Sequence, residues 1–340
     1  MQDIADRVGI STKSVSRVLN GEPGTSARTT ERVLAVAREL GFRRNDLARS
    51  LARGDRTGTV GLVLRHSSTR FYENLIRGVD EVADAHGALV LTAGSHSEDR
   101  ERSTLLALSS RRVDGMLIVP VGRDQTYLRA EQAMGMPLVF VDRPPSGVAA
   151  DAVLADDRGG GLLATRHLLK HGHRRIGVVG ASTSVHTVNE RIAGYDAAIA
   201  EAGLTRDPRL VQLDVQGSAA ARAAVLRLLA EPSPPTALFL LNSVCTIGAL
   251  RALDDAGLAG RVALVGFDDF DTADLLTPAV TVVAHDIVEM GRRAAARLFA
   301  RIGGEDGAPA LDVLPTTLIP RGSGELVRAR QVARAPTCPR

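Results

Sequence analysis

Short and cationic hydrogen-bonding side chains gather in a stretch close to the N-terminus. Thr12, Lys13, Ser16 and Arg17 would share one face of a helix over residues 12–19. Such side chains pair with phosphates and with base edges. Residues 1–56 hold 11 Lys and Arg against 7 Asp and Glu, whereas the remainder holds 31 against 32. This excess also fits an ordinary solvated surface, so it favours a nucleic-acid reader only together with the side chains.

Two other groups of side chains could do chemistry. His167 and His171 would share a helical face close to His173, and such a spacing can bind zinc. A helix C-terminus also favours histidine through its dipole, so we expect no metal site. The carboxylates that could act in acid–base catalysis are Asp156, Asp157, Asp268 and Asp269. Because the chain has no G-x-S-x-G, P-loop or strand-linked G-x-G-x-x-G motif, an enzyme is the second choice and no cofactor is expected.

The N-terminal donors need short helices to position them. Gly9 would end a first helix, and Ser11 can cap a second because its hydroxyl accepts from free N–H groups. A third helix would begin after Ser26 and end at Gly41. The expected buried stripes are Ile4, Ala5 and Val8, then Val15, Val18 and Leu19, then Val33, Leu34, Ala37 and Leu40. One apolar and one donor-rich face is typical of a helix-turn-helix, whose second helix enters the major groove of DNA.

Length and composition restrict the class of protein. The 340 residues exceed one core, and 44% of them are hydrophobic. No apolar run approaches the roughly 20 residues of a membrane span, and the N-terminus lacks the features of a secretion signal. Cys245 lies in an apolar segment and Cys338 in a polar tail, so we expect no structural disulfide. These features predict a cytoplasmic protein, associated with the nucleoid when it binds DNA.

From Thr59 the chain alternates between strands and helices. Strands are expected at 59–64, 89–93, 115–120, 137–142, 175–180, 236–241 and 261–267, with helices that include 72–86 and 158–171. This pattern predicts an α/β core of doubly wound parallel sheets, and its roughly 265 residues predict two subdomains. A shared pattern, G-x-D-x-x-x-x-A-x-G, at 78–87 and 194–203 indicates duplication. Ligands bind outside the carboxyl ends of such strands, so we expect a cleft site between the subdomains.

Several longer sequence motifs along the chain match those of one protein family, and they occur in the same order. They are VSRVLNG (15–21), ERVLAVARELGF (31–42), NDLARSLARGDRTGTVGLVL (45–64), HLLKHGHRRIGVVG (167–180), ERIAGYDAAIAEAGL (190–204), VGFDD (265–269) and MGRRAA (290–295). Over residues 2–323 the chain resembles the lac/galactose repressor (LacI/GalR) family of bacterial transcription regulators. The resemblance implies an all-α helix-turn-helix headpiece, a hinge helix and a core like periplasmic sugar-binding proteins. It also implies a homodimer on a palindromic operator of double-stranded DNA, controlled by a small, sugar-like effector. A secreted solute-binding protein would share the core, but it would need a signal peptide and no headpiece.

The resemblance also implies roles for single residues. Thr12, Lys13 and Arg17 would face base edges, and Leu51 would wedge into a minor-groove step. The other expected DNA contacts are Ser11, Ser14, Ser16, Asn20, Thr29, Asn45 and Ala48. The expected effector contacts are Phe71, Tyr72, Ser95, Asp142, Arg191, Asn242 and Asp268. Two of these have plain alternatives, because Asp268 could only cap the next segment and Arg191 could be a charge on a helix surface.

The expected domain boundaries coincide with the same motifs. They are a headpiece at 1–44, a hinge at 45–57, a core at 58–323 and a polar tail at 324–340, with core subdomains at 58–157 plus 286–313 and at 158–285 plus 314–323. The chain departs from the family pattern near the effector site. Arg70 replaces a common proline, Val215 stands where several members have an aromatic ring, and His285 replaces a frequent glutamine. These departures leave the identity of the effector open.

Overall fold

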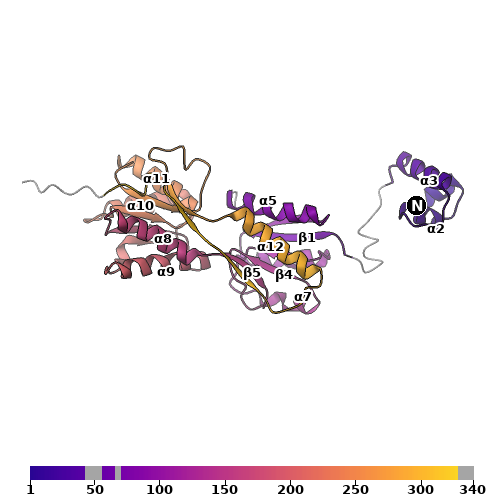
Figure 1. Ribbon diagram of the computed structural model, residues 1–340, viewed down its shortest axis with the longest axis horizontal. Coiled ribbons are helices and arrows are strands. Elements are labelled where there is room, and N and C mark those ends of the chain that lie inside the picture. Colours follow the sequence, from indigo (N-terminus) through magenta and orange to yellow (C-terminus); the bar gives the residue numbers. More distant parts are fainter. Residues whose placement is uncertain (43–55, 66–69, 328–340) are drawn as a thin grey trace, which may run out of the picture. The chain divides into compact units, whose positions relative to one another are not determined.

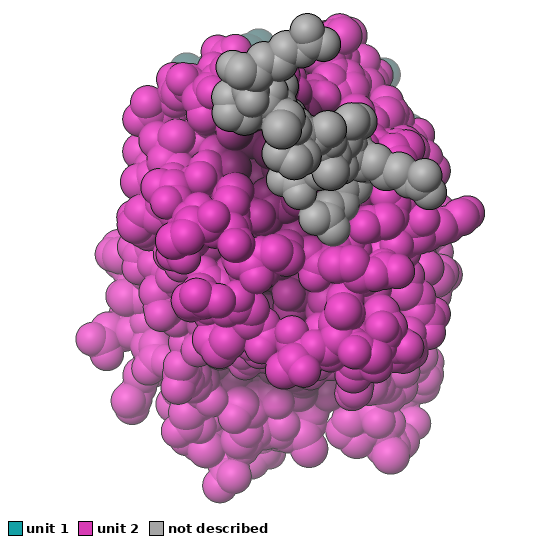
Figure 2. Space-filling view, turned by 90° about the vertical axis from the view of Figure 1, so that its left-hand side faces the viewer, with its two compact units in different colours: residues 1–57 teal, residues 58–340 magenta. Residues whose placement is uncertain are grey.

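The computed structural model describes residues 1–42, 56–65 and 70–327. The chain divides into two compact units, Met1–Thr57 and Gly58–Arg340 (Figure 2). Within the described ranges, none of the helices has the length and apolar character needed to cross a membrane. The expected hinge contacts Asn45, Ala48 and Leu51 lie outside the described residues.

The first unit holds α1 (Gln2–Val8), α2 (Thr12–Leu19) and α3 (Ala27–Glu39). The predicted helix caps are confirmed. Ser11 Oγ accepts from the backbone N–H of Ser14 at 3.2 Å, and Ser26 Oγ accepts from that of Thr29 at 3.3 Å. Helix α1 ends at Gly9, whose φ of 74° lies in the left-handed region that glycine tolerates.

A small core joins these three helices. Its buried side chains are Ile4, Ala5, Val8, Val15, Val18, Val33 and Ala37. The prediction for two leucines is wrong, because Leu34 is 43% exposed and Leu40 is 39% exposed. Val33 and Ala37, four residues apart, form the inward face of α3, and each further residue turns about 100° around the helix. Leu34 is therefore rotated away from the core, and Leu40 comes directly after the last helical residue.

The described residues of the second unit form two six-stranded sheets. The first has the order β11-β5-β4-β3-β1-β2 and is parallel, and the second has the order β12-β10-β9-β8-β6-β7 and is parallel except for the β10–β12 pair. The first five strands of each half thus run 2-1-3-4-5, a doubly wound order, which confirms the predicted fold class.

The strands of the first sheet are β1 (Thr59–Arg65), β2 (Leu89–Ser95), β3 (Met116–Ile118), β4 (Leu138–Val141), β5 (Asp151–Ala155) and β11 (Leu311–Leu314). Those of the second sheet are β6 (Ile176–Val179), β7 (Val211–Gln212), β8 (Ala237–Leu240), β9 (Ala263–Phe267), β10 (Thr281–Ala284) and β12 (Thr317–Ile319). Each sheet's last strand therefore comes from the C-terminal part of the chain, after the chain has visited the other half.

Helices cover both faces of each sheet (Figure 1). In the first half, α5 (Arg70–Ala85) and α12 (Ile287–Ile302) pack on one face, while α6 (Glu98–Ser110) and the turn η1 (Thr126–Leu128), followed by α7 (Arg129–Ala133), supply the other. In the second half, α8 (Asp157–Lys170) and α9 (His186–Glu201) pack opposite α10 (Gly217–Leu229) and α11 (Ser243–Asp255), with the turn η2 (Pro208–Leu210) before β7.

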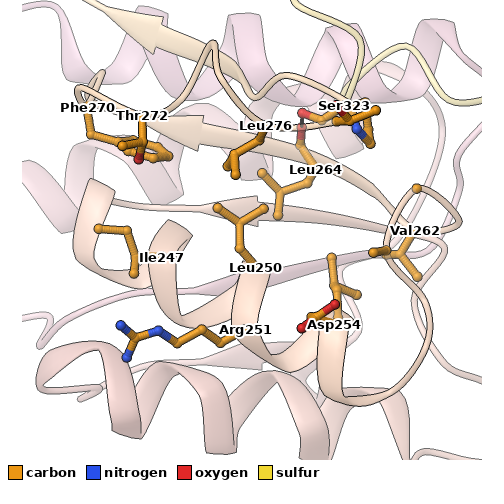
Figure 3. A pocket seen from close by; sticks show the side chains of 15 residues that line it. Ile247, Leu250, Arg251, Asp254, Val262, Leu264, Phe270, Thr272, Leu276 and Ser323 are labelled. Atoms are coloured by element: carbon orange, nitrogen blue, oxygen red, sulfur yellow. Dashed lines mark hydrogen bonds between the residues drawn. The ribbon is translucent and has the colours of Figure 1, made fainter.

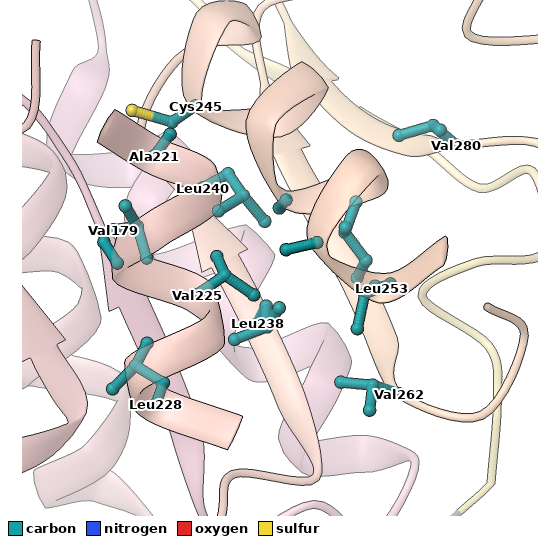
Figure 4. Close-up of a cluster of buried hydrophobic side chains, with 14 of the residues drawn as sticks. Val179, Ala221, Val225, Leu228, Leu238, Leu240, Cys245, Leu253, Val262 and Val280 are labelled. Atoms are coloured by element: carbon teal, nitrogen blue, oxygen red, sulfur yellow. The ribbon is translucent and has the colours of Figure 1, made fainter. Parts of the chain in front are cut away.

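The buried core beneath α10 and α11 is typical of these layers. Val225 and Leu228 of α10 point toward Leu238 and Leu240 of β8 (Figure 4). All four side chains are almost fully buried. Burial of apolar side chains on both faces explains why these strands read as continuous apolar runs in the sequence.

Two of the helix pairs that cross in direct backbone contact have a glycine on each helix at the crossing. Gly78 of α5 and Gly291 of α12 face one crossing, and Gly161 of α8 and Gly194 of α9 face the other. A methyl group on any of the four would overlap a carbonyl oxygen of the facing helix. Gly78 and Gly194 are the first glycines of the repeated sequence pattern, so the repeat reflects equivalent helix crossings in the two halves.

The chain passes between the two halves three times. The passages lie between β5 and α8, between β10 and α12, and between β11 and β12 (Figure 1). Two of them are joined, because the Asp156 N–H donates to the Leu314 carbonyl at 2.8 Å and the Thr316 hydroxyl donates to the Asp156 carbonyl at 3.2 Å. Residues that follow the carboxyl ends of strands in the two halves therefore lie close to one another, beside these passages.

Candidate functional site

Helix α2 presents its polar face to solvent. Thr12 and Lys13 are exposed and Arg17 is half-buried, and these side chains form no hydrogen bond with the described residues. The Arg17 side chain lies over Gly24, where an added methyl would come 3.3 Å from its Nη1 atom. The turn after α2 thus packs against the Arg17 side chain and leaves the N–H groups of the guanidinium available to a partner.

The neighbouring hydroxyl and amide groups are partly used within the unit. The Ser11 and Ser14 hydroxyls lie 2.9 Å apart, and Asn20 Nδ2 donates to Ser16 Oγ at 3.3 Å. The Thr29 hydroxyl lies 2.9 Å from that of Ser26. These bonds hold the expected phosphate contacts in fixed positions around the ends of α2 and α3.

In the second unit, Arg191 of α9 lies at the centre of a buried ionic network and is only 5% exposed. Its Nε donates to Asp157 Oδ1 at 2.7 Å and its Nη1 to the Leu241 carbonyl at 2.6 Å. The same Nη1 is 3.4 Å from Asp268 Oδ2, and the guanidinium carbon lies 3.6 Å from the centre of the Phe267 ring. The interpretation of Arg191 as a surface charge is therefore wrong.

Burial controls the titration of this network. It raises the pKa of Asp157 to about 7, an effect that Arg191 opposes and Asp142 and Asp268 reinforce. Burial alone would lower the pKa of Arg191, but the facing carboxylates outweigh it and the pKa rises. Arg191 consequently stays charged and fixes the position of Asp268, whose Oδ1 is shielded from solvent and has no hydrogen-bond partner among the described residues.

Asp142 and Asp268 occupy equivalent places in the two halves. Asp142 comes directly after β4 and Asp268 directly after β9, and both have left-handed φ angles, 69° and 66°. Such angles are uncommon outside glycine, although Asp tolerates them better than most residues. The two carboxylates thus stand at the carboxyl ends of matching strands, where ligands of doubly wound sheets bind.

Two aromatic rings from α5 approach this polar cluster. Phe71 and Tyr72 pack edge to face, with ring centres 5.1 Å apart. Burial raises the pKa of Tyr72 to about 12, and Asp142 of the first half and Asp268 of the second add to the rise. Tyr72 therefore lies where the two halves face each other.

The remaining expected effector contacts, Ser95 and Asn242, form hydrogen bonds with residues close to them in the sequence. Ser95 is buried and donates to the Ser97 carbonyl at 2.9 Å. Asn242 caps α11, because its Oδ1 accepts from the Cys245 N–H at 2.8 Å, which leaves its amide protons for another partner. Val215 is buried in the apolar core under α10, so it does not present a side chain in place of the family's aromatic ring.

Sequence reasoning gave no binding role to Arg143, the residue after Asp142. Its Nε is 3.4 Å from Asp142 Oδ2 and its Nη1 donates to the Pro120 carbonyl at 2.8 Å. Asp157 entered only as a possible catalytic acid, although it anchors Arg191. The sequence signal that could have indicated Arg143 is its position beside Asp142, directly after a buried strand. No such signal exists for the ion pair of Asp157 and Arg191, because the two residues lie far apart in the sequence.

Three of the four carboxylates considered for catalysis, Asp156, Asp157 and Asp269, are engaged in caps or ion pairs. Asp156 accepts from the Gly159 N–H at 2.8 Å as the cap of α8. Asp269 binds both terminal nitrogens of Arg321 at 2.7 Å, and Arg321 lowers the pKa of Asp269. Engaged carboxylates of this kind are poorly placed to transfer protons to a substrate.

The three histidines considered for metal binding also have protein partners. His173 Nε2 donates to the Leu326 carbonyl at 2.7 Å, so in the neutral ring Nδ1 accepts from the Thr236 hydroxyl at 2.9 Å. His167 Nε2 lies 2.6 Å from Glu325 Oε1, and His171 Nδ1 bonds the His167 carbonyl at 2.9 Å. Throughout the described part of the chain, no group of three or more His, Cys, Asp or Glu side chains is placed to hold a metal ion.

Comparison with known proteins agrees with this architecture. Residues 1–45 match the model of bacterial regulatory proteins of the lacI family, and residues 165–324 match a periplasmic binding protein-like domain. The transcriptional regulator GalR of Escherichia coli is 30% identical over 326 residues, which are 95% of each chain. The chain belongs to the LacI family. It is a DNA-binding transcriptional regulator with an effector-binding type of core.

Other relatives extend this likeness within the LacI family. A ribose operon repressor of Haemophilus influenzae is 29% identical and is matched over 89% of this chain and 91% of its own. A solved complex of the regulator CelR with cellobiose is 31% identical, with a TM-score of 0.73 over 94% of this chain and 98% of that one. The lac repressor dimer bound to operator and an anti-inducer shares the fold at a TM-score of 0.82 and 23% identity, over 95% of this chain and 98% of that one.

Proposed function

We propose that this regulator represses transcription by binding a palindromic operator as a homodimer, and that a small sugar-like effector in the cleft changes its affinity for that operator. The observation that carries the proposal is the buried Arg191, whose Nη1 lies 3.4 Å from Asp268 Oδ2, while Asp268 Oδ1 has no hydrogen-bond partner among the described residues. A carboxylate acceptor beside the Phe71 and Tyr72 rings suits the hydroxyls and the apolar face of a sugar.

DNA reading is assigned to α2. Thr12, Lys13 and Arg17 would contact base edges, because their donors are exposed or free of internal partners among the described residues. Operator selection from a random DNA pool, followed by fluorescence anisotropy, tests this assignment. We expect a palindromic consensus with two half-sites, whereas uniform binding to all sequences would contradict it.

A screen by thermal shift tests the effector proposal. D-ribose and cellobiose are chosen because relatives are named for them, and D-galactose widens the range of stereochemistry. A ligand at 100 times its dissociation constant stabilises the folded protein by about 2.7 kcal/mol. We expect one sugar class to raise the melting temperature and to change operator affinity. A sugar that binds without changing operator affinity would contradict the regulatory part.

An apolar hollow supports the homodimer. Its volume is about 400 Å³, and Ile247 and Leu250 of α11 face Phe270 and Leu276 across it (Figure 3). Leu276 is 38% exposed and the adjacent Leu275 is 76% exposed. Exposed leucines beside an apolar hollow indicate an association surface. In a two-fold symmetric dimer, a second copy of the chain would cover this surface with its own equivalent surface.

Sedimentation equilibrium tests this surface. We expect Leu276→Glu to produce monomers and to weaken operator binding. The matched control is Leu311→Glu, because Leu311 is 64% exposed on strand β11 of the other sheet. This control should remain dimeric, and a Leu276→Glu protein that also remains dimeric would contradict the proposed interface.

The remaining assignments depend on this function. We place the headpiece at 1–44, the hinge at 45–57, the core at 58–323 with its two subdomains as predicted, and a polar tail at 324–340. The protein would act in the cytoplasm, on the nucleoid, without catalysis. The engagement of Asp156, Asp157 and Asp269 in caps and ion pairs supports the absence of an enzymatic role.

A further inference from the structure

Arg191 carries a single positive charge and faces two carboxylates. Its Nε donates to Asp157 Oδ1 at 2.7 Å, and its Nη1 lies 3.4 Å from Asp268 Oδ2. In the other half, the Nε of Arg143 is 3.4 Å from Asp142 Oδ2, so that guanidinium serves a carboxylate of its own. Three carboxylates thus face two guanidinium groups in this cluster, which would hold one negative charge in excess if all three were ionised.

Little water reaches the cluster to stabilise such an excess. Asp157 is 3% exposed, and the side chains of Asp268 and Asp142 are 16% and 11% exposed. An uncompensated charge is far more costly in such surroundings than in water, and a carboxylate there takes up a proton instead. Asp157 is the most deeply buried of the three, and burial raises its pKa to about 7. The cluster therefore holds its extra proton on Asp157.

The other titratable groups around Asp157 do not offset the excess charge. Burial lowers the pKa of His285, so its ring is neutral near pH 7, and burial raises the pKa of Tyr72 to about 12, so its hydroxyl is neutral as well. Asp156 and Arg158, the neighbours of Asp157 in the sequence, are exposed to solvent. The groups that surround Asp157 from α9, α5, the ends of β4 and β9 and the passage after β10 are Arg191, Tyr72, Asp142, Arg143, Asp268 and His285.

An effector bound beside Asp268 would act on the proton of Asp157 in two ways. It would replace water at the exposed edge of the cluster, which makes a second negative charge close to Asp268 more costly. A hydroxyl group that donates to Asp268 Oδ1, which has no hydrogen-bond partner among the described residues, would also hold Asp268 in its ionised form. Both effects raise the pKa of Asp157 above its value in the free protein.

We propose that Asp157 is a positioning residue of the effector cleft, which holds Arg191 in place and takes up a proton from solvent when the effector binds, so that effector affinity rises as the pH falls. This inference rests on the effector role proposed above and adds a form of regulation to it. The effector response would then strengthen whenever the surroundings of the protein become more acidic.

The sign of the effect follows from linkage between the proton and the effector. The bound state keeps the proton of Asp157 to a higher pH than the free state does. Affinity is therefore constant at a pH well below 7, where Asp157 is protonated in both states, and it falls as the pH rises above about 7. The fall amounts to about tenfold for each unit by which binding raises the pKa of Asp157.

Isothermal titration calorimetry of the full chain tests this linkage. The ligand is whichever of D-ribose, D-galactose and cellobiose binds the wild type. Each titration at pH 7.5 is repeated in phosphate and in Tris, because these buffers release a proton with very different heats. The difference in binding heat gives the number of protons taken up, which we expect to be a clear fraction of one per site. The dissociation constant should be lower at pH 6.0 than at pH 8.5, by about tenfold for a rise of one unit in the pKa.

Two amide variants separate the proton from the structure. Asp157→Asn cannot titrate but keeps an oxygen that can accept from Arg191 Nε, so its affinity should stay close to that of wild type at pH 6.0 throughout the range, without proton uptake. Asp156→Asn is the matched control, because asparagine caps a helix as well as aspartate does, and it should keep the wild-type pH profile. A merely structural role of Asp157 would lower the affinity of Asp157→Asn equally at every pH and leave the proton uptake in place.

Infrared spectroscopy of the wild type follows the same proton without any substitution. A protonated carboxyl group has a carbonyl band that a carboxylate lacks. We expect this band to fade as the pH rises from 5.5 to 8.5, and to grow again when the sugar is added at pH 7.5. Absence of the band at pH 5.5 would show that Asp157 is already ionised and would overturn the proposal.

The proposal and the function on which it rests fail in different ways. Sugar binding without proton uptake, or with an affinity independent of pH, would overturn the linkage and leave the effector function intact. A wild-type pH profile in Asp157→Asn would assign the proton to another group. Failure of all three sugars to bind would refute the sugar-like effector and the linkage with it, whereas a protein that binds no operator would refute the proposed function itself.

Discussion

The ion pair between Arg191 and Asp157 allows a sharp test of how the cleft is built. Arg191→Met removes the partners of Asp157 and of the Leu241 carbonyl while keeping an apolar side chain of similar length. Asp157 is 3% exposed, so its carboxylate would remain buried without a counter-charge. Removing one member of a buried pair costs about 3–5 kcal/mol, which lowers the melting temperature of a unit of this size by about 6–15 °C.

The loss of stability should depend on pH. The pKa of Asp157 is raised to about 7 in the folded protein and is about 3.9 in an unfolded chain. Its ionisation therefore costs folding free energy as the pH rises from about 4 to 7. Because removal of Arg191 raises this pKa further, the deficit relative to wild type should be smallest near pH 5.5, where Asp157 is mostly protonated in both proteins, and largest at pH 8.5.

Urea unfolding at pH 5.5 and 8.5 measures this deficit, and a double-mutant cycle isolates its cause. In the Arg191→Met background, Asp157→Asn removes the stranded charge and should recover a large part of the loss at pH 8.5. A deficit that is equal at the two pH values would refute the buried-charge explanation. So would a double variant no more stable than Arg191→Met alone.

Three further predictions concern the reader, the cleft and the helix crossings. Arg17→Ala should cost about 1–3 kcal/mol of operator binding and relax the preference at one base pair, as measured by anisotropy on a set of single-substitution operators; unchanged specificity would remove Arg17 from base reading. Asp268→Ala should abolish the effector response in the same assay and retain operator affinity, and a normal response would mean that Asp268 does not contact the effector. Gly194→Ala should destabilise the protein by about 1–3 kcal/mol in urea unfolding, because the added methyl overlaps a backbone carbonyl of α8; an unchanged midpoint would show that the helices can separate freely.

Features fixed by neighbouring residues could be predicted from the sequence. The caps at Ser11 and Ser26 depend on a hydroxyl and an N–H three residues apart, and both form as expected. The long apolar runs gave the central strands of both sheets, because burial on both faces leaves a continuous apolar signal. The exposure of Leu34 could not be predicted, since a stripe of the same spacing can be drawn through either of two adjacent residues.

Features built from distant segments escaped prediction. Strand β11 pairs with β5 across roughly 160 residues of chain, and each is only four or five residues long, so neither carries a strong local pattern. The Arg191–Asp157 pair joins two helices, and its burial depends on a crossing that no local signal reveals. The effector-site residues came from family resemblance, whereas the anchoring role of Asp157 and the unpaired oxygen of Asp268 emerged only from the packed structure.

The glycine crossings have a mechanical consequence. Where α5 meets α12 and α8 meets α9, backbone rests on backbone, with no long side chains between them to change rotamer and absorb a shift. Each half should therefore move as a stiff body, and strain introduced by a ligand has to be relieved in the three short connections. Hydrogen bonds of Asp156 join two of those connections to each other. We expect these bonds to oppose a twist of one half against the other, so that the halves move mainly by bending about the connections. The third connection, between β10 and α12, lines a hollow to which residues of both halves contribute, so a change within that hollow would act directly on the connection.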